Sequence, residues 1–478
     1  MNVTMSIFTG FETARRALMA QQQALNTTNH NIANANTPGF SRQQAVFATT
    51  PAYTLGHSLA GTALEMGTGV KIEDIRRMRD SFLDYQFRSE VKELGRWEVR
   101  RDTLQKMEVV INEHSEAGLA SVLESFWDSW HELAENPESS TARAVVLQQG
   151  IALVDTLNHL NWQLYQLRQD LNETLEIYIN EINSLARQIA DLNDQIIRVE
   201  ASSKRANDLR DKRDLLVDQL AKLTGVHVTE KESGAIDVVI GNRGLVEGTR
   251  ALSLKTQGDR EIADLVPVWS DDMPFDVNAG SLKGIAEARE LLDDFQDKLN
   301  TLVREMASKV NELHRGGYGI DDDKTSDLNF FTRTNTDKPI GPGNITINSK
   351  LLENPDLLAA AADADEVPGD GRNALALAQL RHTAISDLGE TTSITDFYNS
   401  LVADLGIRAR EADRMAGNQE LVTGQIDTRR AMVAGVNLDE EVANMIRYQH
   451  AYNAAARMIT AIDEMLDVIV NRMGIVGR

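Results

Sequence analysis

Cysteine is absent from the 478 residues, so disulfides, thiolate metal sites and cysteine nucleophiles are excluded. No apolar run approaches the ~18 residues that a membrane-spanning helix needs, so we expect no membrane insertion. Positive charge is also scarce, because 49 lysines and arginines stand against 72 aspartates and glutamates, for a net charge of −23. A nucleic-acid-binding surface needs clustered cations, so this acidity argues against nucleic acid as a partner.

The N-terminus shows no basic region followed by an apolar stretch, so we expect no cleavable secretory signal. Arg15-Arg16 precedes the run Gln21–Gln23, where a twin-arginine signal would need apolar residues. Residues 1–43 hold three arginines and one glutamate, and residues 436–478 hold four arginines and six acidic residues. The net charges of the two ends therefore cancel, and the middle of the chain carries the whole net charge of −23. Near-neutral ends favour close packing there and solvation of the acidic middle.

Proline is rare and unevenly placed. Six of the nine prolines lie between Pro267 and Pro368, and none lies in 138–266 or in 369–478. Because proline removes a backbone donor and breaks helices, the two proline-free stretches are predicted to be helical. The segment between them is predicted to be irregular and partly β.

Both ends of the chain carry apolar residues in alternating steps of three and four, the pattern of a helix that packs along another helix. Polar residues interrupt the stripes at Gln21, Thr28, Gln449 and Asp463, which favours several partners over a simple two-helix pair. Two interpretations stay open: one coiled-coil domain whose ends meet, or assembly through the paired ends. The predicted assembly interface comprises Ile7, Phe11, Leu18, Leu25, Ile32, Leu438, Val442, Met445, Tyr452, Ile459, Leu466, Val470 and Met473.

A third apolar stripe runs from Leu157 to Val199, and its helical pattern resumes from Leu209 to Leu223. Period-two, β-branched segments then predict a small β domain over 226–282. Shorter helices are expected at about 74–113, 119–134, 284–314 and 371–430, and a strand is expected at 344–347.

We therefore predict a mainly α fold: a long helical bundle or coiled-coil body with paired N- and C-terminal helices and a small inserted β domain. The predicted domains are an N-terminal assembly helix and turn at 1–45, a first helical segment at 46–225, the β domain at 226–282, a second helical segment at 283–435 with a loop and β segment at 316–368, and a C-terminal assembly helix at 436–478.

Patterns for catalysis or metal binding are weak. No two of the nine histidines have the spacing of a zinc-binding helix or turn. Asp321, Asp323 and Thr325 faintly resemble a calcium loop, but Ser326 occupies the position of the turn glycine, so a solvated acidic loop is favoured. No Walker-type lysine and no Gly-x-Ser-x-Gly nucleophile elbow occurs. The sequence thus proposes no catalytic, metal or cofactor-binding residue, and we expect no enzyme.

Residues 31–42 read as a helix end followed by a turn, in which Pro38-Gly39 suits the central positions of a type II turn. This segment resembles the N-terminal motif of bacterial flagellar rod, hook and hook-associated proteins. Residues 437–452 are similar to the C-terminal motif of the same families. The residues of the turn motif are Asn31, Asn34, Thr37, Pro38, Gly39 and Phe40.

The segment 206–216 narrows the resemblance to the hook-associated protein 1 family, whose members form the hook–filament junction. Segments 245–248 and 280–284 support this likeness, whereas Phe40 stands where tyrosine is common and Arg210 where an apolar residue is usual. The residues of the helix motif are Asn207, Asp208, Leu209, Asp211, Arg213 and Asp214.

The resemblance implies a structural subunit that the flagellar type III system exports to the hook tip outside the cell. Implied partners are copies of itself in a ring, the hook protein, the second hook–filament junction protein, and a cytoplasmic export chaperone at the C-terminal helix. The alternatives are a sibling axial protein, namely the hook protein or the second junction protein, and a type III-secreted effector or enzyme.

Overall fold

The computed structural model describes residues 2–55, 64–111, 118–202, 205–241, 243–259, 264–335, 337–385, 388 and 392–472, with the side chains of 2–7, 54, 55, 64, 65, 471 and 472 outside the description. These residues form two compact units. The first unit comprises Met1–Lys92, Asn180–Leu254 and Glu420–Arg478, and the second comprises Glu93–Ile179 and Lys255–Gln419. Helices α2 (Ser81–Ile111), α4 (Ser140–Glu200) and α9 (Ile394–Ala434) contribute residues to both units.

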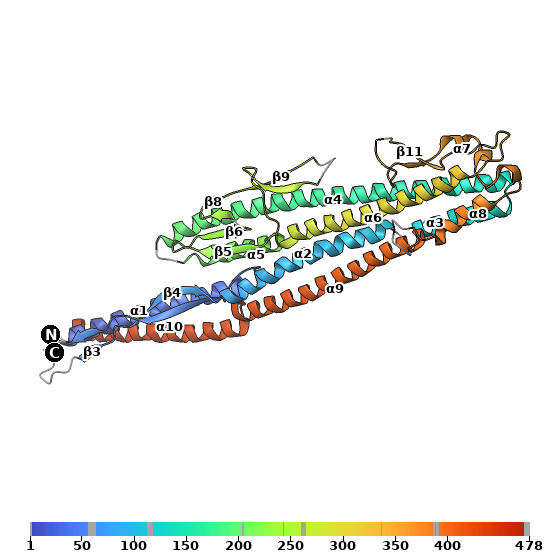
Figure 1. Cartoon of the computed structure of the whole chain (residues 1–478). Coiled ribbons are helices and arrows are strands. Elements are labelled where there is room, and N and C mark those ends of the chain that lie inside the picture. Colours follow the sequence, from blue (N-terminus) through green and yellow to red (C-terminus); the bar gives the residue numbers. More distant parts are fainter. Residues whose placement is uncertain are drawn as a thin grey trace. The chain divides into compact units, whose positions relative to one another are not determined.

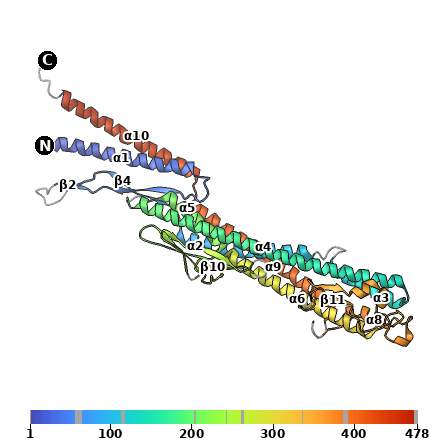
Figure 2. The ribbon, with the colours of Figure 1, turned by 90° about the horizontal axis from the view of Figure 1, so that it is seen from above.

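In the first unit the two chain ends pair as helices: α1 (Asn2–Ala33) lies along α10 (Leu438–Asp467), as Figures 1 and 2 show. The side chain of Asn437 accepts hydrogen bonds from the backbone N–H groups of Asp439 and Glu440, so the helix start predicted there has its N-cap. A short π-helix, Val468–Arg472, follows α10. The paired terminal helices that the sequence predicted are confirmed.

Strands β1 (Gln43–Thr49) and β4 (Val70–Arg77) form an antiparallel pair beside α1, and β2 (Tyr53–Leu55) pairs with β3 (Leu64–Met66). We placed 46–225 in a helical segment with a helix at about 74–113, so strands β1 to β4 were not predicted and the predicted start of the helix is wrong. The β1–β4 pairing joins residues more than twenty positions apart, and such a non-local partner leaves little trace in the local pattern. Helix α2 begins only at Ser81.

Helix α5 (Asn207–Leu223) leads into a four-stranded antiparallel sheet in the order β5-β6-β7-β8. The strands are β5 (Val226–Glu230), β6 (Ile236–Ile240), β7 (Arg243–Glu247) and β8 (Arg250–Ala251). The alternate residues Ile236, Val238 and Ile240 are buried, as the period-two pattern predicted. The segment 226–282 divides between the units, with β5 to β8 in the first and β10 (Val266–Trp269), which pairs with β9 (Leu254–Gln257), in the second.

The second unit surrounds an apolar core built by α3 (Leu119–Glu135), α6 (Gly280–Gly316), α8 (Arg372–Gln379) and parts of α2, α4 and α9. Aromatic rings fill its centre: Phe330 lies 5.7 Å from Phe126 and 5.5 Å from Trp130, measured between ring centroids. The heptad leucines from Leu157 to Leu171 are buried in this core, as predicted. The remaining elements are β11 (Phe331–Arg333), β12 (Ile345–Ile347), α7 (Ser349–Glu353) and the 3-10 turns Pro355–Leu357, Ala364–Glu366 and Leu380–His382.

Asparagine side chains of α4 hold neighbouring backbone segments in place by hydrogen bonds. The side chain of Asn193 donates to Ile236 O and accepts from Ile236 N, and Asn183 bonds the backbone of Leu254 in the same two-way manner. In the second unit, Asn172 accepts hydrogen bonds from Leu265 N and from Arg289. Asparagine is a poor helix former, so these positions on a long helix serve tertiary bonds, not helix stability.

In the acidic loop that faintly resembles a calcium site, the Asp321 carboxylate is hydrogen-bonded within the loop. Both carboxylate oxygens of Asp321 accept hydrogen bonds from Thr325, at 2.9 Å from its backbone N and 2.5 Å from its hydroxyl. Across the part of the chain that the structure describes, no group of three or more histidines and carboxylates is placed to hold a metal ion. No helix among the described residues is long and apolar enough to cross a membrane.

Candidate functional site

The buried apolar side chains on α1 and α10 are mostly small. Ala14, Ala20 and Ala24 of α1 and Ala455 and Ile462 of α10 are buried. Small residues let two helix backbones approach closely, which accounts for a packed pair without large apolar side chains. The buried positions of α10 follow a seven-residue spacing that begins at Glu441.

The predicted apolar stripes only partly coincide with this contact. Leu18, Leu25 and Ile32 on α1 are half-buried, and so are Met445, Tyr452, Ile459 and Leu466 on α10. Phe11, Leu438, Val442 and Val470 are exposed, and the side chains of Ile7 and Met473 lie outside the described residues.

Near the end of α1, a side chain is hydrogen-bonded to the first residue of β1. The Asn31 side chain donates to Gln43 O at 2.8 Å and accepts from Gln43 N at 2.9 Å, and it also donates to Glu441 Oε2 at 3.1 Å. Glu441 in turn accepts from Arg42 Nε at 2.7 Å. One asparagine from the N-terminal motif thus joins the first strand to the C-terminal helix.

The turn after α1 has the predicted form. Phe40 N donates to Thr37 O at 3.2 Å and Gly39 has φ +77°, as the third position of a type II turn requires. A Cβ at Gly39 would lie 3.2 Å from the Leu215 side chain, so the turn packs closely on α5. Asn34 donates to His30 O at 3.0 Å and accepts from the Thr37 hydroxyl at 3.2 Å, which holds the turn against the end of α1.

Helix α5 bonds the same segment from its other side. Asp211 accepts from Ser41 N at 2.9 Å, and Asp208 accepts from Gln43 Nε2 at 2.7 Å. Asn207 donates to Ile75 O on β4 at 2.7 Å. The three motifs that carry the family resemblance therefore meet in one network within the first unit.

Two further residues of the α5 motif have other roles. Leu209 is half-buried. Arg213 is buried. It donates to Asn193 Oδ1 on α4 at 3.0 Å and to Gly234 O, between β5 and β6, at 2.7 Å. Burial lowers the pKa of Arg213 to about 10, so it still carries its charge at neutral pH.

An ionic cluster extends the network to α2 and α9. Arg77 contacts Asp214 at 2.7 Å, and Arg430 of α9 contacts Asp218 at 2.6 Å and Asp84 of α2 at 3.0 Å. Burial alone would raise the pKa of Asp214, but Arg79 and Arg77 outweigh it and hold that pKa below its usual range. Burial raises the pKa of Asp211 despite its bond to Arg77.

Sequence reasoning missed the partners of these motifs, namely Arg42, Gln43, Arg77, Asp218, Arg430 and Glu441. A signal for some of them was present, because Asp211, Asp214 and Asp218 recur at helical spacing on one face of α5. Such a stripe is usually solvated. Only the fold brings arginines to it, namely Arg77, Arg79, Arg88 and Arg430.

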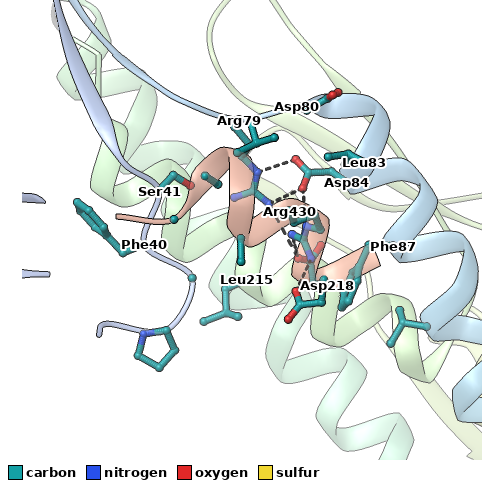
Figure 3. Close-up of a pocket in the computed structure, with 18 of the residues that line it drawn as sticks. Phe40, Ser41, Arg79, Asp80, Leu83, Asp84, Phe87, Leu215, Asp218 and Arg430 are labelled. Carbon is teal, nitrogen blue, oxygen red and sulfur yellow. Dashed lines mark hydrogen bonds and ion pairs between the residues drawn. The ribbon is translucent and has the colours of Figure 1, made fainter. Parts of the chain in front are cut away.

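A pocket of about 550 Å³ lies beside this network, between the turn, the first turns of α2, α5 and the end of α9 (Figure 3). Leu83, Phe87 and Leu215 give it apolar walls, and Arg430 crosses it to reach Asp84 and Asp218. The Arg430 guanidinium lies 4.2 Å from the centroid of the Phe87 ring.

Comparison with known proteins identifies the family. The chain is 35% identical to flagellar hook-associated protein 1 of Bacillus subtilis, over 99% of this chain and 100% of that protein. It belongs to the flagellar hook-associated protein 1 family. The protein of the same name from Salmonella typhimurium is 25% identical over 96% of this chain and 98% of its own length.

Three protein families match this chain, and their matched ranges contain the turn motif, the α5 motif and the C-terminal motif. The flagellar hook-associated protein FlgK helical domain matches residues 104–331, the flagella basal body rod protein family matches 11–40, and the flagellar basal body rod FlgEFG protein C-terminal family matches 433–473. The flagellar hook junction protein FlgK from Burkholderia pseudomallei shares the fold, with a TM-score of 0.61 at 18% identity over 73% of this chain and 100% of that one. The mainly α fold with a small β region is thereby confirmed.

Proposed function

We propose that this chain is a structural subunit of the hook–filament junction at the hook tip, where it is required for filament assembly. The observation that carries the proposal is the network of Asn31, Gln43 and Glu441, which joins both terminal motifs of the axial proteins in one compact unit. The full-length likeness to hook-associated protein 1 supports this member of the group over the hook protein or the second junction protein. The relatives are structural flagellar proteins, which fits a role without catalysis.

The chain associates with other flagellar components, and the paired terminal helices provide the surface for it. The specific partners proposed are copies of itself in a ring, the hook protein and the second junction protein. Type III export through the growing flagellum places the subunit outside the cell. Exposed apolar side chains of α10 are available for such contacts, because Leu438, Val442 and Val470 are 51%, 43% and 73% exposed.

Before export, these exposed apolar side chains need cover, because exposed apolar surface promotes aggregation. A cytoplasmic chaperone that binds the C-terminal helix would provide it and would compete with neighbouring subunits for the same side chains. The variant Leu438→Asp with Val442→Asp is expected to lose chaperone binding and incorporation together, since a buried carboxylate carries a desolvation cost. Leu421→Asp on α9, where Leu421 is 68% exposed, is the matched control.

The junction role is tested in a flagellated bacterium that lacks its own family member. Electron microscopy should show bare hooks without the chain, and filaments with a labelled subunit at the hook tip when the chain is supplied. A label found along the filament or along the hook would contradict the junction role and favour a sibling axial protein.

A further inference from the structure

An exposed face of α1 carries a second stripe with anchor spacing. Phe8, Phe11, Arg15 and Met19 follow steps of three and four, which place them along one line of the helix. Phe8 is 64% exposed and Met19 55%, whereas Ala14, Ala20 and Ala24 on the other side are buried. Helices that insert into a groove of a partner present anchors at this spacing.

The stripe is also a positive spot on an acidic chain. Arg15 Nη1 lies 3.4 Å from Met19 Sδ, so the guanidinium belongs to the same face. Glu12 is shared between Arg15 and Arg16, at 2.7 and 2.9 Å, which leaves one positive charge in excess. Residues 1–43 hold three arginines and one acidic residue, in a chain of net charge −23.

The pocket beside the turn has the complementary character. Its apolar walls include Val433 as well as Leu83, Phe87 and Leu215, and its volume of about 550 Å³ lies in the ~300–1,000 Å³ range of binding clefts. Four aspartates, Asp80, Asp84, Asp218 and Asp427, line it against Arg79, Lys222 and Arg430, an excess of one negative charge. The Asp427 side chain lies 3.7 Å from Arg430 but is 67% exposed, so it is accessible to a docking cation.

We propose that the outer stripe of α1 from one copy, formed by Phe8, Phe11, Arg15 and Met19, docks in the turn–α9 pocket of the next copy, with Arg15 toward Asp427. This inference rests on the proposed function and names the contact by which the subunits assemble. The apolar anchors lose their exposed surface, and the cation and the acidic rim set the direction of docking.

The contact has to form between copies. Phe8 lies 25 residues before the end of α1, or about 38 Å along the helix at 1.5 Å per residue. The turn that lines the pocket follows directly after that end, so the stripe of one chain cannot reach its own pocket. Because stripe and pocket are different surfaces, the contact is head-to-tail, and successive copies form a ring where the rotation closes.

The absence of cysteine gives a direct test, because introduced thiols are the only ones in the chain. Met19→Cys and Val433→Cys both alter exposed side chains, and the double variant is to be expressed in a bacterium that lacks its own family member. Treatment of the isolated flagella with a short thiol crosslinker should give a ladder of multimers. An equal mixture of the two single variants should give dimers and nothing larger. The control pair, Met19→Cys with Val109→Cys in the second unit, should give neither.

The outcomes separate this inference from the proposed function. Variants that incorporate at the hook tip but give no ladder would overturn the docking and leave the junction role standing. Failure of the unaltered chain to reach the hook tip would instead contradict the junction role itself.

If the cysteine variants do not assemble, exchanging the charges of Arg15 and Asp427 provides a second test of the docking. Arg15→Asp or Asp427→Arg alone should lower incorporation about fivefold, equivalent to the ~1 kcal/mol of an exposed ion pair, and the double variant should restore it. Asp413→Arg, at an exposed position that precedes Asp427 on α9, should not rescue Arg15→Asp. A double variant no better than its parents would overturn the proposal.

Discussion

Arg42 Nε donates to Glu441 Oε1 at 2.7 Å although the two residues are 399 positions apart in the chain. The Glu441 side chain is 3% exposed, and Asn31 donates to its other oxygen. The residue before the first strand and helix α10 are thus held together by an almost fully buried carboxylate. Its loss would leave Asn31 and Arg42 without a common acceptor.

Glu441→Ala is expected to destabilise the first unit by about 2 kcal/mol. Removal of one partner of a buried pair leaves the other unsatisfied, but Arg42 keeps a 3.0 Å contact with Glu440, which limits the loss. Amide hydrogen exchange over 31–43 and 437–449 should accelerate. The control is Glu440→Ala, whose side chain is 59% exposed and whose effect should stay within about 0.5 kcal/mol. Equal effects from the two variants would contradict the importance of the buried carboxylate.

Gly39→Ala is expected to cost about 1–2 kcal/mol, because φ +77° strains any residue with a Cβ and because Leu215 lies 3.2 Å from that Cβ. Gly67→Ala is the matched control, since nothing lies within 4 Å of its Cβ and its φ is not in the left-handed region. Thermal unfolding of the two variants should differ clearly. A Gly39→Ala protein as stable as the Gly67→Ala protein would show that the turn adapts without cost.

Gly406→Ala and Gly424→Ala in α9 are expected to stabilise the protein by about 0.5–1 kcal/mol each. A Cβ at either position meets no atom within 4 Å, and alanine loses less backbone entropy than glycine in a helix. Denaturant midpoints of the single and double variants measure the gain, which should add because the positions are distant. Unchanged midpoints would contradict the prediction. They would mean that alanine at these positions costs the folded helix as much free energy as it gains in backbone entropy.

His314 should make the second unit sensitive to acid. Its Nδ1 lies 2.6 Å from Leu328 O and its Nε2 lies 3.3 Å from Ala359 N, so the neutral ring donates at Nδ1 and accepts at Nε2. Burial lowers the pKa of His314 to about 4, below its ordinary 6.5, and the nearby Arg143 adds to the effect.

Between pH 6.5 and 4 the unfolded chain binds a proton at His314 that the folded chain does not, so the free energy of unfolding falls as the pH falls. The full loss is about 3 kcal/mol, it is complete near pH 4, and no loss from this group occurs above pH 6.5. Denaturant unfolding at pH 7 and pH 4.5 measures it. His314→Gln should flatten this pH dependence, whereas His131→Gln, at a side chain 54% exposed, should leave it unchanged.

Local patterns in the sequence were sufficient to predict most of the long helices, although not all of their ends. The leucine stripe from Leu157 to Leu171, the N-cap at Asn437 and the Pro38-Gly39 turn each depend on residues within a few positions of one another, and the structure has all three. The absence of cysteine and the excess of acidic residues likewise need no fold to be interpreted. The resemblance to the axial proteins depended on such contiguous segments.

Tertiary structure alone decided which of these segments meet. The pairing of β1 with β4, the contact of α5 with the turn, and the choice of Ala455 and Ile462 over Leu438 and Val442 at the α1 contact all depend on residues far apart in the chain. An apolar stripe specifies that a helix face will be covered, but not by which partner, because burial of apolar surface is non-directional. The directional bonds of Asn31, Asp211 and Glu441 select one arrangement, and their partners are visible only once the chain has folded.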